Sequence, residues 1–136
     1  ILEITLQYAK DLNKVNLLTK MDVYAEVFIV GGGNTTNLKV KTPADHRGDD
    51  SPTWDFPMNF RIDEREMKYS RLALVFKLVC KRALGDKVVG ETQVPIKELL
   101  ETQEKGTAAD GRVFVSYQVR KPDGKPKGQI SFSYKF

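Results

Sequence analysis

The sequence has one cysteine, one histidine and no apolar run near the roughly 20 residues that a membrane-spanning helix needs. Because Cys80 has no second cysteine to pair with, an internal disulfide framework is excluded, which is consistent with a reducing compartment. His46 lies in a polar stretch without Ser-His-Asp spacing, a phosphate-binding loop or a paired-carboxylate pattern, so we expect no enzyme activity. A basic, apolar, small-residue leader is also missing. From these absences we expect a soluble, non-catalytic protein, although the sequence starts at Ile1 rather than at methionine.

Charge of one sign is only slightly in excess. The chain carries 22 Lys and Arg against 18 Asp and Glu, a formal net charge of +4, which is compatible with an anionic partner without identifying one. A nucleic-acid surface would combine basic residues with exposed aromatic side chains, whereas the aromatic residues here mostly follow the pattern of a core. We therefore expect no nucleic-acid partner. At 136 residues, the chain is expected to form a single domain spanning residues 1–136.

Apolar and polar residues alternate along most of the chain, the period of two that is typical of half-buried β-strands. Strands are predicted in the segments 1–8, 22–30, 38–42, 54–62, 72–78, 113–119 and 130–136. Trp54 belongs to the apolar face of its segment, and Pro57 there indicates an edge strand or a bulge. Only 95–101 has the pattern of a helix, one to two turns long. About eight short strands and one short helix predict an all-β fold, a β-sandwich.

Several short segments, in this order, carry a family resemblance: Ala9-Lys10-Asp11-Leu12, Lys20-Met21-Asp22-Val23-Tyr24, Ser51-Pro52-Thr53-Trp54, Val89-Gly90-Glu91, and the closing segments 116–120 and 132–136. Together they resemble a C2 domain and, within that fold, the plant C2 proteins named after a soybean cold-regulated gene (the SRC type). The resemblance covers essentially the whole chain. It implies an eight-stranded antiparallel C2-type β-sandwich with one short helix.

C2 domains that bind calcium use about five aspartates on loops at one end of the sandwich, because a hard dication needs several carboxylate oxygens. The resemblance places these positions on Asn16, Asp22, Val79, Lys81 and Lys87, so most of the carboxylates are replaced. Asp86 lies one residue out of register, and Asp49 and Asp50 precede Ser51. We therefore expect no metal and no cofactor. If calcium binds after all, its ligands would be Asn16, Asp22, Asp50 and Asp86; otherwise Asp22 is expected to accept hydrogen bonds from loop amides.

The same loops offer another means of membrane attachment, since the resemblance places them at one end. Apolar residues alternate there with basic residues, and the predicted lipid contacts are Lys14, Leu17, Leu18, Lys20, Lys81, Arg82, Leu84 and Lys87. A second candidate is the pair Lys39 and Lys41, which matches the Lys-x-Lys of the family's basic groove for phosphoinositide headgroups. Glu26 and Phe28 stand where relatives place lysines, so these two lysines either contact a headgroup or form a solvated strand face.

The resulting hypothesis is a non-catalytic C2 module that binds anionic membrane lipids with weak or no calcium dependence, in plant stress or defence signalling. We expect it in the cytoplasm, peripherally at the inner face of the plasma membrane or at another endomembrane. Two alternatives stay open. One is an adaptor that binds a protein partner not identified by the sequence, and the other is a calcium-dependent phospholipid sensor.

Overall fold

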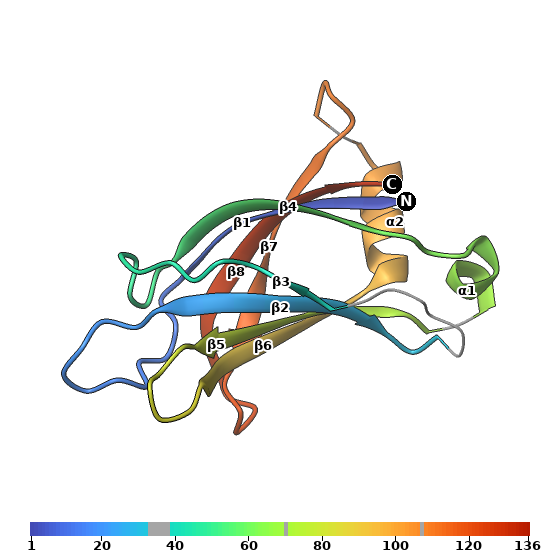
Figure 1. Cartoon of the computed structure of the whole chain (residues 1–136). Helices are drawn as coiled ribbons and strands as arrows, with labels where there is room; N and C mark the ends of the chain where they lie inside the picture. Colours follow the sequence, from blue (N-terminus) through green and yellow to red (C-terminus); the bar gives the residue numbers. More distant parts are fainter. Residues whose placement is uncertain (33–38, 70, 107) are drawn as a thin grey trace.

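The computed structural model describes residues 1–32, 39–69, 71–106 and 108–136. Within these residues, eight antiparallel strands lie in the sheet order β3-β2-β5-β6-β7-β8-β1-β4 (Figure 1). Their bounds are β1 Leu2–Lys10, β2 Val23–Val30, β3 Val40–Lys41, β4 Thr53–Phe60, β5 Ala73–Cys80, β6 Lys87–Pro95, β7 Val113–Arg120 and β8 Pro126–Lys135. The predicted eight-stranded β-sandwich is confirmed. β4 is an edge strand, as Pro57 predicts.

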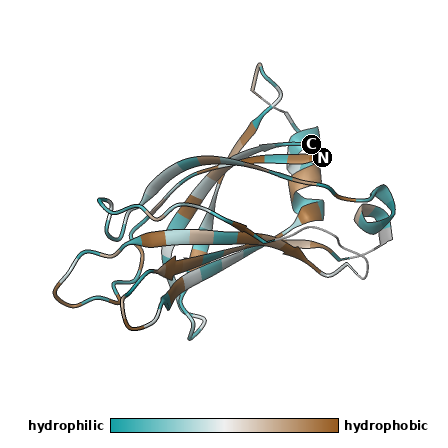
Figure 2. Ribbon diagram, viewed as in Figure 1, coloured by the Kyte–Doolittle hydropathy of each residue, from teal (hydrophilic) through white to brown (hydrophobic). Residues whose placement is uncertain are grey.

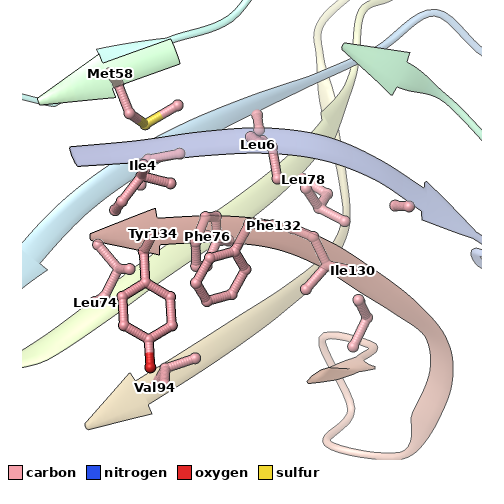
Figure 3. Close-up of a cluster of buried hydrophobic side chains, with 14 of the residues drawn as sticks. Ile4, Leu6, Met58, Leu74, Phe76, Leu78, Val94, Ile130, Phe132 and Tyr134 are labelled. Atoms are coloured by element: carbon pink, nitrogen blue, oxygen red, sulfur yellow. The ribbon is translucent and has the colours of Figure 1, made fainter. Parts of the chain in front are cut away.

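The sheet folds over itself into two four-stranded halves. β6 and β7 are joined only at the pair Glu91 and Arg120, so the sheet nearly separates there. The two halves meet through their inner faces, where the ring centroids of Phe76 on β5 and Phe132 on β8 are 4.8 Å apart (Figure 3). Alternate side chains of each strand enter this core, because successive residues of a strand point to opposite faces. The apolar positions of the predicted alternation thus face the core of the sandwich, and the polar positions face outward.

Two helices close the end of the sandwich where the chain termini lie (Figure 1). α2, Ile96–Glu104, follows the extended Pro95 and confirms the helix predicted at 95–101. It is fixed to the core by the buried hydroxyl of Tyr134, which donates to the Leu99 carbonyl at 2.7 Å. α1, Glu64–Tyr69, was not predicted. Its residues are mostly charged and show no apolar period, and it begins where the Asp63 carboxylate accepts a hydrogen bond from the Arg65 amide.

The β7–β8 turn lies at the opposite end of the sandwich from these helices, and so do three longer connections (Figure 1). We name them loop 1 (residues 11–22, between β1 and β2), loop 2 (42–52, between β3 and β4) and loop 3 (81–86, between β5 and β6). Backbone hydrogen bonds connect them: the Lys81 amide donates to the Asp22 carbonyl at 2.8 Å, and the Leu12 amide donates to the Asp50 carbonyl at 3.0 Å. The topology therefore gathers the predicted lipid and metal residues of all three loops at one end.

Candidate functional site

Loops 1 and 2 are joined by an ion pair. The Lys14 ammonium lies 3.1 Å from one carboxylate oxygen of Asp49, and the other oxygen accepts a hydrogen bond from the Met21 amide at 2.9 Å. The Met21 amide, more than Lys14, holds the pKa of Asp49 below its usual value, and the bond to Asp49 raises the pKa of Lys14. Lys14, a predicted lipid contact, thus already shares its charge with a protein carboxylate. The Lys14 ammonium group, rather than a metal ion, links loops 1 and 2.

Loop 3 is attached to β2 through Asp86. The Tyr24 hydroxyl donates to Asp86 at 2.7 Å, and the Arg82 amide donates to its other carboxylate oxygen at 3.1 Å. These bonds, the one from Tyr24 first, lower the pKa of Asp86, while burial and the neighbouring carboxylate raise the pKa of Tyr24 to about 12. The Lys41 ammonium lies 4.4 Å from the Tyr24 ring centroid on the same face. Asp86, which lies one residue out of register with the calcium-ligand positions, therefore has a structural role: it holds loop 3 against β2.

The four residues named as calcium ligands do not form a coordination sphere. The Asn16 amide donates to the Lys20 carbonyl at 3.3 Å, Asp22 lies 3.2 Å from Nδ1 of His46, and Asp86 is bonded to Tyr24. Within the described residues, no three His, Cys, Asp or Glu side chains are grouped so that they could hold a metal ion. The side chains present do not fit a calcium ion, which needs six to eight oxygen ligands.

The tips of loops 1 and 3 expose large apolar side chains. Leu17 and Leu18 are each 98% exposed and Leu84 is 99% exposed, although leucine is normally among the buried residues. Figure 2 shows these apolar segments among hydrophilic ones on both loops. A cavity of about 440 Å³ separates the two loops and is lined by Asn16, Thr19, Lys20, Asp22, Lys81, Arg82, Ala83 and Leu84. Exposed leucines thus stand beside a cleft with three basic side chains and one acidic one.

The remaining predicted contacts lie farther from this cleft. Lys87 is exposed at the start of β6 and does not line it. Lys39 is 3.2 Å from Glu26 and lies 4.9 Å from the Phe28 ring centroid, and Lys41 lies over Tyr24. The two residues that replace the family's lysines are therefore in contact with Lys39 themselves. This arrangement reduces the charge that Lys39 can offer to a headgroup.

Strand pairing produces one further feature that sequence reasoning missed. Five charged residues on adjacent strands are paired in register across the outer face of one half of the sandwich and onto β7, and their signs alternate: Lys41, Glu26, Lys77, Glu91 and Arg120. Opposite charges on directly paired residues stabilise neighbouring strands. No local sequence signal could reveal this row, because its members come from five strands and meet only through the register.

Comparisons with known proteins agree with this architecture. The family model of the C2 domain matches residues 1–110. Protein SRC2 of Glycine max and its homolog in Arabidopsis thaliana are each 43% identical to the chain over 99% of its length. The chain spans 45% and 40% of those two proteins, less than half of either. A C2 domain of plant Extended Synaptotagmin 1 has a TM-score of 0.73 at 17% identity, covering 98% of this chain and 92% of that one. Among the described residues, no helix is long and apolar enough to cross a membrane.

Proposed function

Because this chain belongs to the C2 domain family, we propose that it is a non-catalytic module that binds anionic phospholipids through loops 1 and 3, with weak or no calcium dependence. The observation that carries the proposal is the almost complete exposure of Leu17, Leu18 and Leu84 beside basic side chains. These leucines lose few contacts with the protein when they enter a membrane interface. The basic residues would lie at the level of the lipid headgroups.

The charges and the leucines together support reversible docking. Four basic residues, Lys20, Lys81, Arg82 and Lys87, contribute roughly 1 kcal/mol each near an anionic surface. Lys14 is left out of this sum because it is paired with Asp49. Partial insertion of three leucines adds about 0.8 kcal/mol for each buried CH₂. The loss of translational and rotational freedom offsets at least about 4 kcal/mol of this gain. Binding is therefore expected to be weak, reversible and dependent on the anionic lipid content.

Calcium is not needed to organise the loops in this proposal. The bonds of Asp49 with Lys14 and Met21, and those of Asp86 with Tyr24 and Arg82, hold loops 1, 2 and 3 with protein groups alone. The docking end would then be preformed at any calcium concentration. A metal-free mode of this kind would limit regulation by calcium and leave lipid composition and salt as the controlling variables.

The proposed location is the cytoplasm, peripherally at the inner face of the plasma membrane or at another endomembrane. The cytoplasmic leaflet carries anionic lipids and attracts basic loops. A role in plant stress or defence signalling is proposed on the similarity to the SRC2 proteins of soybean and Arabidopsis. We also propose that residues 1–136 form one domain, because β8 pairs with β1 and completes the sheet begun in the matched region.

Vesicle co-sedimentation tests this function. Vesicles of phosphatidylcholine alone are compared with vesicles that also contain phosphatidylserine, each in excess calcium and in chelator. We expect pelleting with phosphatidylserine in both conditions, and loss of pelleting in Lys81→Glu/Arg82→Glu. The matched control is Lys68→Glu/Lys97→Glu, which makes the same charge change at exposed positions on α1 and α2, at the other end of the sandwich, and should pellet normally. Pelleting only with calcium would contradict metal-free docking, and no pelleting under any condition would favour the protein-adaptor alternative.

A further inference from the structure

A second cavity lies at the end of the sandwich opposite the three loops, where α1 and α2 approach the sheet (Figure 1). Its volume is about 740 Å³, within the range of roughly 300–1,000 Å³ typical of small-molecule sites. The lining residues are Met67, Lys68, Arg71, Leu72, Ala73, Pro95, Ile96 and Lys97. Neither the three loops of the docking end nor the row of paired charges includes any of them.

The chemistry of this cavity is divided between its floor and its rim. The buried side chains of Leu72 and Ile96 and the partly buried Met67 form an apolar floor. Lys68, Arg71 and Lys97 are exposed at the rim, and among the described residues none that lines the cavity is acidic. Within the described part of the chain, none of these three basic residues is in an ion pair, in contrast to Lys14 and Lys39. A ligand with an apolar body and one negatively charged head group would match both the apolar floor and the basic rim.

The backbone around the cavity narrows the class of ligand. Ala73 is paired on both sides, with Val30 of β2 and with Pro95 of β6. The Ile96 amide already donates to the Leu72 carbonyl at 3.0 Å. An extended peptide that adds to a sheet needs an unpaired strand edge, and these lining residues do not provide one. A ligand without backbone amides, held by apolar contact and one charge interaction, suits the cavity better.

We propose that this cavity, which we name the basic-rimmed cavity, binds a single long-chain carboxylate, an anionic amphiphile of the fatty-acid class. The alkyl chain lies on the floor formed by Met67, Leu72 and Ile96, and the carboxylate is paired with Lys68, Arg71 or Lys97. Because the cavity is at the other end of the sandwich from loops 1 and 3, the ligand and a membrane can be bound at the same time.

The probe is dodecanoate below its micelle concentration, titrated into the whole chain and followed by the ¹³C-methyl NMR signals of Met67, Leu72 and Ile96. We expect saturable shifts of these signals. Butanoate should bind at least about tenfold more weakly, because it buries eight fewer CH₂ groups. Dodecyltrimethylammonium, with the same chain and the opposite charge, should give no saturable shift. No saturable shift with dodecanoate, or equal shifts with the two dodecyl compounds, would overturn the proposal.

Charge reversal at the rim provides the second test. Lys68→Glu/Lys97→Glu should weaken dodecanoate binding by roughly tenfold or more, since two attractions become repulsions at a solvent-exposed site. This variant should still pellet with phosphatidylserine vesicles. Lys81→Glu/Arg82→Glu should show the converse, so failure of this site and failure of membrane docking are distinguishable. Unchanged dodecanoate affinity in the rim variant would overturn the proposal. The proposal would also be overturned if a labelled acidic helical peptide of Leu and Glu bound in the basic-rimmed cavity and dodecanoate did not.

Discussion

Truncating the exposed leucines of loops 1 and 3 should separate membrane affinity from stability. In Leu17→Ala/Leu84→Ala, each substitution removes about three carbon atoms from a side chain that is 98% or 99% exposed. Full burial of three carbons would contribute about 2.4 kcal/mol at 0.8 kcal/mol per group. Insertion to between a quarter and a half of that depth gives about 1–2.5 kcal/mol for the two sites together. The vesicle partition coefficient should therefore fall roughly 5- to 60-fold.

The folded protein should be nearly indifferent to the same change. The two leucines make little contact with the core, and surface substitutions of this kind usually change the free energy of unfolding by less than about 0.5 kcal/mol. Thermal unfolding of the double variant should match that of the parent protein. The measurement of affinity is a titration with phosphatidylserine-containing vesicles, in chelator, at fixed salt.

Phe114 offers a matched control for this experiment. It is 60% exposed on β7, which lies in the other half of the sandwich from the strands that flank loop 3. Phe114→Ala also truncates an exposed apolar side chain, but it should leave vesicle binding unchanged. The reasoning would be refuted if the double leucine variant bound within twofold of the parent. An equal loss of binding in Phe114→Ala would show that exposed apolar surface in general, and not the loop tips, drives pelleting.

Two further predictions concern stability. Gly90→Ala should destabilise the protein by about 1–3 kcal/mol, because a Cβ there would lie 2.5 Å from Cγ1 of the buried Val119; an unchanged midpoint of urea unfolding would contradict this. The pKa of Asp49 is lowered from 3.8, so its carboxylate stabilises the fold above its unfolded pKa and loses this effect as the pH falls through the folded pKa. The stability deficit of Asp49→Asn should therefore shrink between about pH 5 and about pH 2, and urea unfolding that shows a growing deficit would argue against this role.

The architecture could be predicted largely because its signal is local. Alternation such as Leu2, Ile4 and Leu6 requires a strand with one buried face, wherever its partner lies. α1 was missed because it lacks such a local pattern. Its stability comes from the Asp63 cap and from Met67 packing against the core rather than from an apolar period. A six-residue helix has too few residues for periodicity to be detected.

The candidate site was only partly predictable. Replacement of carboxylates by Lys81 and Lys87 is visible in the chain once the family resemblance is noted. The hydrogen bond between Asp86 and Tyr24, which are 62 positions apart, is not visible in the sequence. The two lysines of the strand pair look equivalent in the sequence, but Lys39 is paired with Glu26 and Lys41 lies over Tyr24. Which charges are shared within the protein depends on distances of a few Å between distant segments.

The sequence by itself determined the strand pattern, the small excess of positive charge and the presence of leucines in polar, basic loops, because each is a property of neighbouring residues. Tertiary structure alone decided that Lys14 is paired with Asp49, that Asp86 is bonded to Tyr24, and that residues of α1 and α2 line the basic-rimmed cavity. The physical reason is that ion pairs and cavities require side chains to meet within a few Å. In a sandwich, those side chains come from strands whose order differs from the order of the chain.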